Sequence, residues 1–270
     1  MPAMTRAPLR TLLRKIAAER MRRSLRTFVR ASSLYDLPIR QCEPGKCRIA
    51  VLAPHMDDEV LGCGGTIARH VAAGSDVTVI FLTDGRRGGG RNVSQTEIVG
   101  ARKAEARSAA QVLGVRAVTF LDAEDSRLRA DPSVPARLRD ILELKRPEIV
   151  YLPFLLEQHP DHRAASGALL AATRGSALRF ECRGYEVWTP LFPNCLVRID
   201  ETIHLKQRAL SCYQSQLAVM DYLHSSIGLN AYRAMGLGSH GGRFAEAFHA
   251  LELADYRRLC TALAPRQFRF

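Results

Sequence analysis

The stretch RIAVLAPHMDDE, residues 48–59, tells most about how this chain folds. Residues 49–54 are apolar without interruption, which is typical of a short strand buried on both faces of a parallel sheet. His55 follows directly, and three consecutive carboxylates follow Met56. A second, mostly apolar run over 148–154 precedes the sequence HPDH at 159–162. Two clusters of imidazoles and carboxylates therefore follow two expected strands.

Strands and helices alternate through the first part of the chain. We expect strands over 48–54, 76–83, 117–121 and 148–154, and helices over 61–73, 97–113, 135–145 and 163–173. Glycine, the favoured residue after a helix, follows the first two helices at 74 and 114. This alternation implies right-handed crossovers between parallel strands. The predicted fold class is therefore α/β: a doubly wound, mainly parallel, Rossmann-like sheet with helices on both faces.

The pattern is weaker beyond residue 180. We expect a pair of strands over 186–189 and 195–199, and helices over 203–215 and 244–253. With 270 residues, of which 47% are hydrophobic, the chain is long enough to bury a core without disulfides. The seven cysteines are odd in number and scattered, so we expect neither a disulfide framework nor a thiolate zinc site. Together with a start that lacks a secretory signal, this favours a cytoplasmic protein.

Most of the net charge of +12 belongs to the first residues of the chain. Residues 1–31 hold nine basic residues and one acidic residue, or +8, which leaves +4 for the rest, so the core gives no reason to expect a nucleic-acid partner. Apolar residues recur at helical spacing over 5–31, which predicts a basic amphipathic helix. It could dock on an anionic membrane surface, or pack on the protein or a partner. We expect an N-terminal extension and linker over 1–45 and an enzyme domain over 46–270.

The two clusters have the composition of an open metal site. In a parallel sheet, the loops that leave the carboxyl ends of the strands meet at one edge, and ligands bind there. A catalytic zinc keeps three protein ligands and one open position. His55, Asp58 and His162 supply such a set. The chain is therefore predicted to be a zinc hydrolase.

The remaining residues of the clusters suit hydrolysis of an amide. Asp57 is the expected general base, because a zinc-bound water has a pKa of about 7 and a nearby carboxylate can take its proton. A protonated His159, held by Asp161, would stabilise the oxyanion or protonate the leaving amine.

These residues allow two other interpretations. The acidic run could merely cap the helix that follows it, since carboxylates suit a helix N-terminus, but a cap needs fewer acids. Gly62, Gly64 and Gly65 suggest a dinucleotide site, but Ile67 stands where the third glycine would be. A nucleotide-dependent oxidoreductase is therefore disfavoured.

These motifs resemble those of the PIG-L or LmbE-like zinc-dependent N-acetylglucosaminyl deacetylases. The family signature is Ala-His-Pro-Asp-Asp-Glu with a glycine-rich helix start, followed downstream by His-Pro-Asp-His. Here the first motif is APHMDDE at 53–59 with LGCGGT at 61–66, and the second is unchanged at 159–162. Met56 replaces the usual proline, and the basic extension is not part of the family's minimal core. The similarity covers residues 48–248.

The resemblance implies an LmbE-like fold and the same division of roles. It also implies a substrate-binding arginine and an aspartate at the rim of the sugar pocket. The complete set is metal ligands His55, Asp58 and His162, catalytic residues Asp57, His159 and Asp161, and substrate-binding residues Arg102 and Asp125.

The predicted function is a bacterial, cytoplasmic Zn²⁺-dependent hydrolase, with Fe²⁺ as the alternative metal. It would remove the N-acetyl group from a small-molecule or lipid-linked, N-acetylglucosamine-like sugar conjugate and release acetate and a free amine. Docking by residues 5–31 would place it at the inner membrane face. The alternative is a non-catalytic sugar- or lipid-headgroup-binding protein of the same fold, docked on a membrane or assembly by its basic helix.

Overall fold

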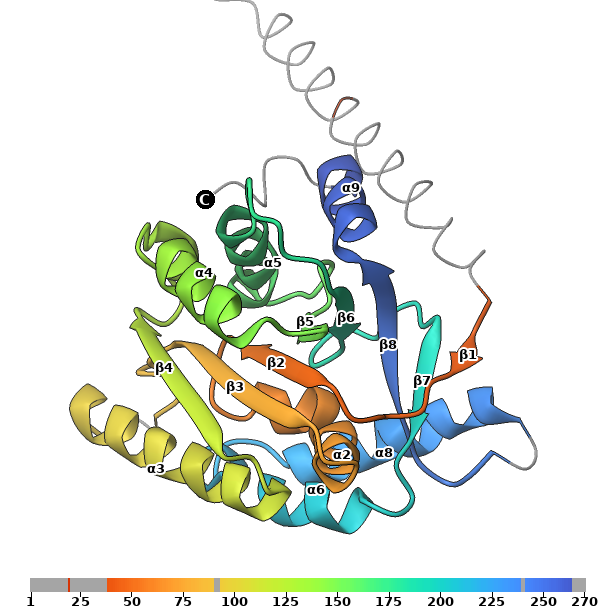
Figure 1. The fold of residues 1–270 in the computed structure, drawn as a ribbon. Coiled ribbons are helices and arrows are strands. Elements are labelled where there is room, and N and C mark those ends of the chain that lie inside the picture. Colours follow the sequence, from red (N-terminus) through yellow and green to blue (C-terminus); the bar gives the residue numbers. More distant parts are fainter. Residues whose placement is uncertain (1–18, 20–37, 90–92, 239–240, 264–270) are drawn as a thin grey trace, which may run out of the picture.

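The computed structural model of this 270-residue chain describes residues 19, 38–89, 93–238 and 241–263. They form an eight-stranded sheet in the order β1-β7-β8-β6-β5-β2-β3-β4, with helices on both faces (Figure 1). The predicted fold class is confirmed. Apart from residue 19, the predicted basic helix over 5–31 lies outside the described residues.

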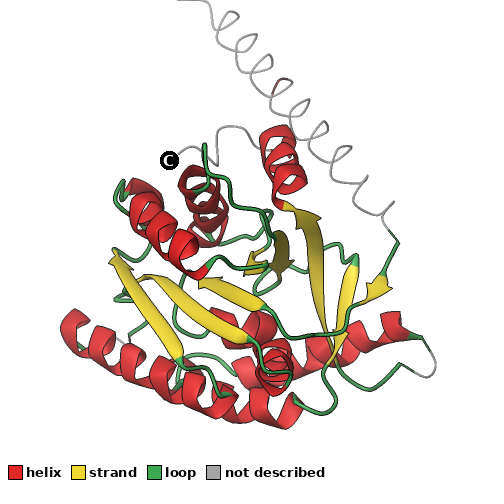
Figure 2. Cartoon of the chain, in the orientation of Figure 1, coloured by secondary structure: helices red, strands yellow, loops and turns green. Residues whose placement is uncertain are grey.

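One side of the sheet is entirely parallel, as predicted. Its strands, in chain order, are β2 (Arg48–Ala53), β3 (Asp76–Thr83), β4 (Ala117–Ala123), β5 (Ile149–Pro153) and β6 (Glu181–Tyr185). The helices that connect them are α2 (Asp58–Ala72), α3 (Gln95–Leu113), α4 (Val134–Lys145) and α5 (Pro160–Ala172), with a short 3₁₀ turn η2 (Leu128–Ala130). Figure 2 shows the strands between two layers of helices.

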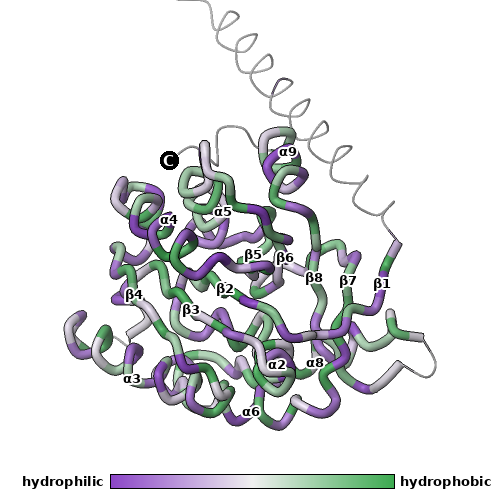
Figure 3. Tube along the Cα trace, in the orientation of Figure 1, coloured by the Kyte–Doolittle hydropathy of each residue, from purple (hydrophilic) through white to green (hydrophobic). Residues whose placement is uncertain are grey.

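Each face of the sheet has its own apolar core. In β2, Ala50 and Leu52 pack into the core under α4 and α5, while Ile49 and Val51 pack into the core under α2 and α3. Apolar side chains therefore occur at successive positions of the strand rather than at alternate ones. In Figure 3, β2 is accordingly coloured as hydrophobic over most of its length.

The other side of the sheet differs from the prediction. β8 (Ala245–Glu252) lies antiparallel between β6 and β7 (Cys195–Arg198), and β1 (Arg40–Gln41) pairs with β7. The predicted helix over 244–253 is therefore wrong: its alanines and glutamates favour a helix locally, but pairing on both sides makes it a strand. The predicted strand over 186–189 is also wrong, because these residues form the loop after β6.

The second half of the chain contributes further helices. They are α6 (Ile203–Leu210), α7 (Gln214–Leu217), α8 (Tyr222–Ala234), the 3₁₀ turn η3 (Met235–Leu237) and α9 (Leu253–Leu263). α6 and α7 replace the single helix predicted over 203–215, and α8 and α9 were not predicted. Among the described residues, no helix combines the length and apolar character needed to cross a membrane.

The cysteines also correct the sequence analysis. Cys42 and Cys195 form a disulfide with a Cα–Cα distance of 5.8 Å. They lie 153 residues apart, so their spacing in the sequence carried no sign of this contact. Since β1 (Arg40–Gln41) belongs to the sheet, the sheet begins before residue 46, the predicted start of the enzyme domain.

Buried His70 on α2 predicts that stability depends on pH. Its Nε2 lies 2.9 Å from the Tyr151 hydroxyl, and burial lowers its pKa from 6.5 to about 4. The unfolded chain therefore binds the proton more readily, and stability that is fully present above pH 6.5 is lost as the pH falls toward 4. Between pH 7 and pH 5 this loss is about 2 kcal/mol.

Urea unfolding at pH 7 and pH 5 tests this. His70→Gln should reduce the pH-dependent loss, whereas His204→Gln, at an exposed position on α6, should leave it unchanged. An equal pH dependence in wild type and His70→Gln would contradict the assignment to His70.

Candidate active site

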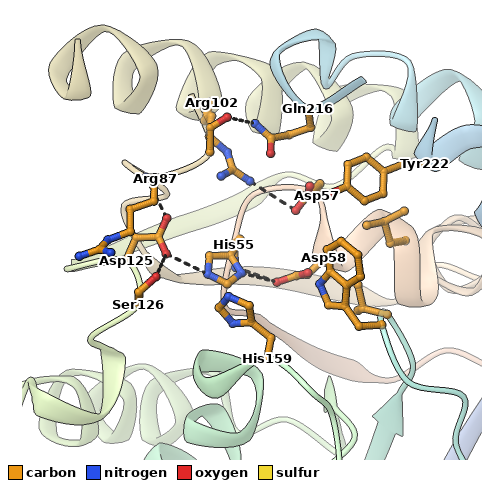
Figure 4. A pocket seen from close by; sticks show the side chains of 14 residues that line it. His55, Asp57, Asp58, Arg87, Arg102, Asp125, Ser126, His159, Gln216 and Tyr222 are labelled. Atoms are coloured by element: carbon orange, nitrogen blue, oxygen red, sulfur yellow. Dashed lines mark hydrogen bonds and ion pairs between the residues drawn. The ribbon is translucent and has the colours of Figure 1, made fainter. Parts of the chain in front are cut away.

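The two histidine and carboxylate clusters meet at the carboxyl ends of the parallel strands. The first cluster follows β2 and begins α2, and the second begins α5. They border a cavity of about 170 Å³ (Figure 4). Loops that follow β3, β4 and β6, together with residues of α3, α7 and α8, complete its wall. Residues that lie about a hundred positions apart in the sequence therefore share one site, as predicted.

Asp58 lies between two imidazoles. Its Oδ2 is 3.3 Å from Nδ1 of His55 and 3.2 Å from Nε2 of His162. All three side chains are buried. The same carboxylate oxygen accepts a hydrogen bond of 2.8 Å from the backbone N–H of His55, which fixes its direction. The structure thus brings the three predicted metal ligands together.

The charges around these ligands suit a bound cation. Burial alone would lower the pKa of His55, but Asp125, Asp161 and Asp58 raise it well above its ordinary value. In the same way, the neighbouring Asp58 outweighs burial and raises the pKa of His162 to about 9. The carboxylates therefore stabilise positive charge here.

The donor atoms also fit a metal ion. Both ring nitrogens of His162 are buried, and within the described part of the chain they have no partner other than the nearby carboxylates of Asp58 and Glu157. Within that part, the ligand atoms of two sets lie within 4.8 Å of one another: His55 with His159 and His162, and His55 with Asp125 and Asp161. His55 is common to both sets. Two imidazoles and a carboxylate are ligands that a zinc or iron ion accepts, so this His and Asp cluster could hold a metal.

Asp57 is held in an unusual backbone conformation beside these ligands. Its φ of 135° is positive, which is uncommon for a residue other than glycine and is a kind of strain found at functional sites. Although it precedes α2, its side chain makes no capping hydrogen bond, so it does not serve as a simple helix cap. Burial raises the pKa of its carboxyl to about 7, despite the opposing charge of Arg102.

Arg102 supports the loop that carries Asp57. Arg102 lies on α3 and is 3% exposed. Its Nη2 donates a hydrogen bond of 2.6 Å to the carbonyl of Met56. The same nitrogen lies 3.4 Å from Oδ1 of Asp57, and Nη1 donates to the carbonyl of Gly85. Arg102 lines the cavity, but these contacts are with the protein. Its predicted contact with substrate stays a prediction, and the structure adds a positioning role.

Asp161 does not pair with the imidazole of His159, which corrects the expected arrangement. Its carboxylate lies 3.3 Å from Nε2 of His55 and accepts hydrogen bonds from the backbone N–H groups of Ser126 and Leu128. Only its backbone N–H reaches His159, where it donates to Nδ1 over 3.2 Å. Burial and the charges of two neighbouring histidines lower the pKa of His159. This direction favours a neutral His159, whereas the sequence predicts a protonated one.

Asp125 lies in the cavity wall, where the resemblance placed it. Its Oδ1 is 3.4 Å from Nε2 of His55, and its Oδ2 accepts a hydrogen bond of 3.0 Å from the backbone of Arg87 (Figure 4). Burial alone would raise the pKa of this carboxyl, but His55 and these hydrogen bonds lower it. A charged carboxylate thus faces the cavity. Its predicted contact with substrate stays a prediction.

Glu157 was not predicted to belong to the site. This fully buried carboxylate lies 3.6 Å from Nδ1 of His162 and accepts hydrogen bonds from the backbone of Val187, Trp188 and Thr189. It ties the loop after β6 to the second imidazole, as outer carboxylates do at metal sites. Its place two residues before HPDH was the only sign in the sequence.

A buried ion pair supports the start of α2. The helix departs from helical geometry at Cys63, which frees two backbone N–H groups, those of Gly65 and Thr66. Both donate to the Glu246 carboxylate, at 3.0 and 2.7 Å. Lys206 donates to the same carboxylate over 2.6 Å and to the carbonyl of Leu61 over 2.8 Å. The pair thus replaces the hydrogen bonds that the kink removes.

A glycine is required near this kink. A side chain at Gly62 would lie 2.1 Å from the ring of Tyr185, so only glycine lets α2 approach β6 this closely. The glycines of the first motif therefore serve packing beside the candidate metal ligands, which agrees with the expectation that they do not form a dinucleotide site.

Comparisons with known proteins place these features in a family. Residues 50–173 match the family model described as PIG-L, GlcNAc-PI de-N-acetylase. The chain is 31% identical over 186 residues to the diacetylchitobiose deacetylase of Thermococcus kodakarensis, covering 63% of this chain and 70% of that protein. It is also 31% identical over 137 residues to the 4-oxalmesaconate hydratase of Pseudomonas putida, covering 46% of this chain and 53% of that protein.

The fold of this chain is also similar to that of a solved structure. The conserved protein TT1542 from Thermus thermophilus superposes with a TM-score of 0.64 and 30% identity. The match covers 75% of this chain and 93% of that one.

Proposed function

Because the chain belongs to the PIG-L family of de-N-acetylases, we propose that its site hydrolyses the acetamido group of an N-acetylglucosamine-like sugar conjugate. The products are acetate and a free amine. The observation that carries this proposal is the position of Asp58 between two buried imidazoles, with the strained Asp57 beside it at the same cavity. This combines a metal-ligand set with an acid–base group, which amide hydrolysis needs.

His55, Asp58 and His162 would hold the metal, with zinc as the first candidate and iron as the second. When bound, the ion would polarise the amide carbonyl and make water acidic enough to attack. Asp161 and Asp125 fix the imidazole of His55 from its other side, and Glu157 does the same for His162.

Asp57 takes the proton of the attacking water in this proposal. Its carboxylate lines the cavity, and Arg102 fixes the loop that carries it. A pKa of about 7 lets a carboxyl accept a proton during attack and return it to the amine that leaves.

His159 donates to the developing oxyanion as a neutral group. Since its Nδ1 accepts the backbone N–H of Asp161, the ring carries its proton on Nε2. His159 lines the cavity, so this N–H can stabilise negative charge there. Asp57, rather than a charged His159, then supplies the proton that the amine requires.

We also propose a cytoplasmic location, docking of residues 5–31 on an anionic membrane, and a lipid-linked form of the substrate. A non-catalytic binding protein is the weaker alternative, because the metal-ligand set and the base are both present.

Acetate release from a panel of N-acetylglucosamine conjugates tests the proposed function, with metal content assayed in the same sample. Wild type should release acetate, and a chelator should stop the release. His162→Asn should lose most of its bound metal and its activity, because one of three ligands is gone. Leu144→Asp, an exposed change on α4, is the control and should retain both. Bound metal without acetate release from any conjugate would favour the binding protein.

A further inference from the structure

A second cavity of about 280 Å³ adjoins the catalytic cavity. Its wall is formed by the loop after β6, by α8 and by the start of α2. Four residues line both cavities: Leu61, Val187, Trp188 and Tyr222. The two cavities therefore meet, and a molecule bound in the first can extend into the second.

The linings of the two cavities differ in chemistry. The catalytic cavity is bordered by imidazoles, carboxylates and two arginines. The second cavity adds the apolar residues Pro190, Met220 and Leu229 to the four shared ones. It is also the larger of the two. An apolar group thus has space directly beside the polar site.

Two aromatic side chains lie where the cavities meet. The rings of Trp188 and Tyr222 are in edge-to-face contact, with centroids 5.9 Å apart. Tyr222 lies on the Asp57 side of the catalytic cavity (Figure 4). Trp188 is 44% exposed, and nearby Met220 is 43% exposed. Large apolar side chains that remain exposed beside a site are typical of a surface that contacts an apolar ligand.

The charge of Glu186, which also lines the second cavity, is already neutralised. Glu186 accepts two hydrogen bonds from the guanidinium of Arg233, at 2.8 and 2.6 Å, and a third from the backbone of Leu191. The carboxylate therefore does not favour a cationic ligand in the second cavity.

A buried hydroxyl supplies an independent sign of a ligand. Ser226 of α8 is 7% exposed and lines the second cavity, and its Oγ has no hydrogen-bond partner among the described residues. Buried polar groups are normally paired, so this hydroxyl is available to an oxygen of a bound molecule.

We propose that the second cavity is an aglycone site, which binds an apolar group attached to the acetamido sugar and offers Ser226 to an oxygen of that group. This inference rests on the proposed function, because it takes the sugar to occupy the catalytic cavity. It names the substrate class: an acetamido sugar joined to an apolar chain or ring, rather than a free sugar or a polar disaccharide.

Trp188 gives a direct measure of binding, because it is the only tryptophan of the chain. We would titrate the metal-loaded Asp57→Asn variant, which should bind without consuming ligand, with hexyl and methyl N-acetylglucosaminides of both anomers. An alkyl chain that covers the indole should shift its emission to shorter wavelength. Each buried methylene raises affinity by about fourfold, so one hexyl anomer should bind at least tenfold more tightly than its methyl counterpart, by a rough estimate.

Charged substitutions added to the Asp57→Asn variant show where the alkyl group of the ligand binds. Leu229→Asp should reduce the preference for hexyl to less than about twofold, since it places a charge in an apolar cavity. Met220→Glu is a second variant at a partly exposed position, for use if the first fails to fold. Leu144→Asp makes the same change on the distant surface of α4 and should leave the preference intact.

The outcomes of these titrations support or overturn the aglycone site. Equal affinity for hexyl and methyl glycosides would overturn the aglycone site, whether or not acetate is released. A preference that survives both charged substitutions would also overturn it. A preference that is lost in these variants supports the site, even if wild type releases no acetate, in which case only the proposed function fails.

Discussion

Asp57→Asn should lower kcat by about 10² to 10⁴ while leaving the bound metal unchanged, because the variant loses a general base and no metal ligand. Asparagine suits the position: it has nearly the same size and is among the residues that best tolerate positive φ. The fold of the loop should therefore persist. Steady-state kinetics and metal content on the same preparation measure the two effects separately.

Asp122→Asn is the matched control for this variant. Asp122 also has a positive φ, of 52°, but its side chain lies on the outer strand β4, where it pairs with Lys103. It should retain wild-type kcat. If Asp57→Asn retains full activity as well, Asp57 is not the base. If it loses its metal, the division between base and ligands is wrong.

Lys206→Met should reduce the free energy of unfolding by about 3 to 5 kcal/mol, because it leaves Glu246 charged and unpaired in the core. Both residues are at most 1% exposed. The substitution also removes the donor to the carbonyl of Leu61, next to the kink of α2. Urea unfolding at neutral pH, with the metal removed from both proteins, measures the loss.

Arg208→Met on the same helix is the control, since it removes a positive charge at an exposed position and should change stability by less than about 0.5 kcal/mol. Combining Lys206→Met with Glu246→Gln removes the unpaired charge. The double variant should therefore be less destabilised than the sum of the single variants. A loss of less than about 1 kcal/mol in Lys206→Met would show that the pair does not support this part of the fold.

The parallel part of the sheet could be predicted because its signals are local. β3 has the predicted bounds, since its apolar run is interrupted on both sides. Gly74 and Gly114 end their helices with φ of 82° and 75°, a conformation that glycine adopts easily. The three candidate metal ligands could also be chosen from the sequence, because each belongs to a motif that follows a strand.

The remaining features depend on contacts between distant segments. β8 is a strand because β6 and β7 bind it on both sides, although its composition favours a helix. Glu157 could not be assigned without knowing that the next loop and His162 both approach it. The contact of Asp161 could not be predicted from the sequence either, because its carboxylate lies beside His55 and not beside His159.

The position of β8 has a consequence for how the protein is made. Because β8 lies between β6 and β7, the ribosome must reach Glu252 before β7 and β1 can join the sheet. The 67 residues from Glu186 to Glu252 take roughly 3 to 13 seconds to synthesise at about 5 to 20 residues per second. During this interval β6 presents an unpaired edge, which invites pairing with other chains. The speed of translation, more than the stability of the finished protein, then sets how long nascent chains are exposed to aggregation.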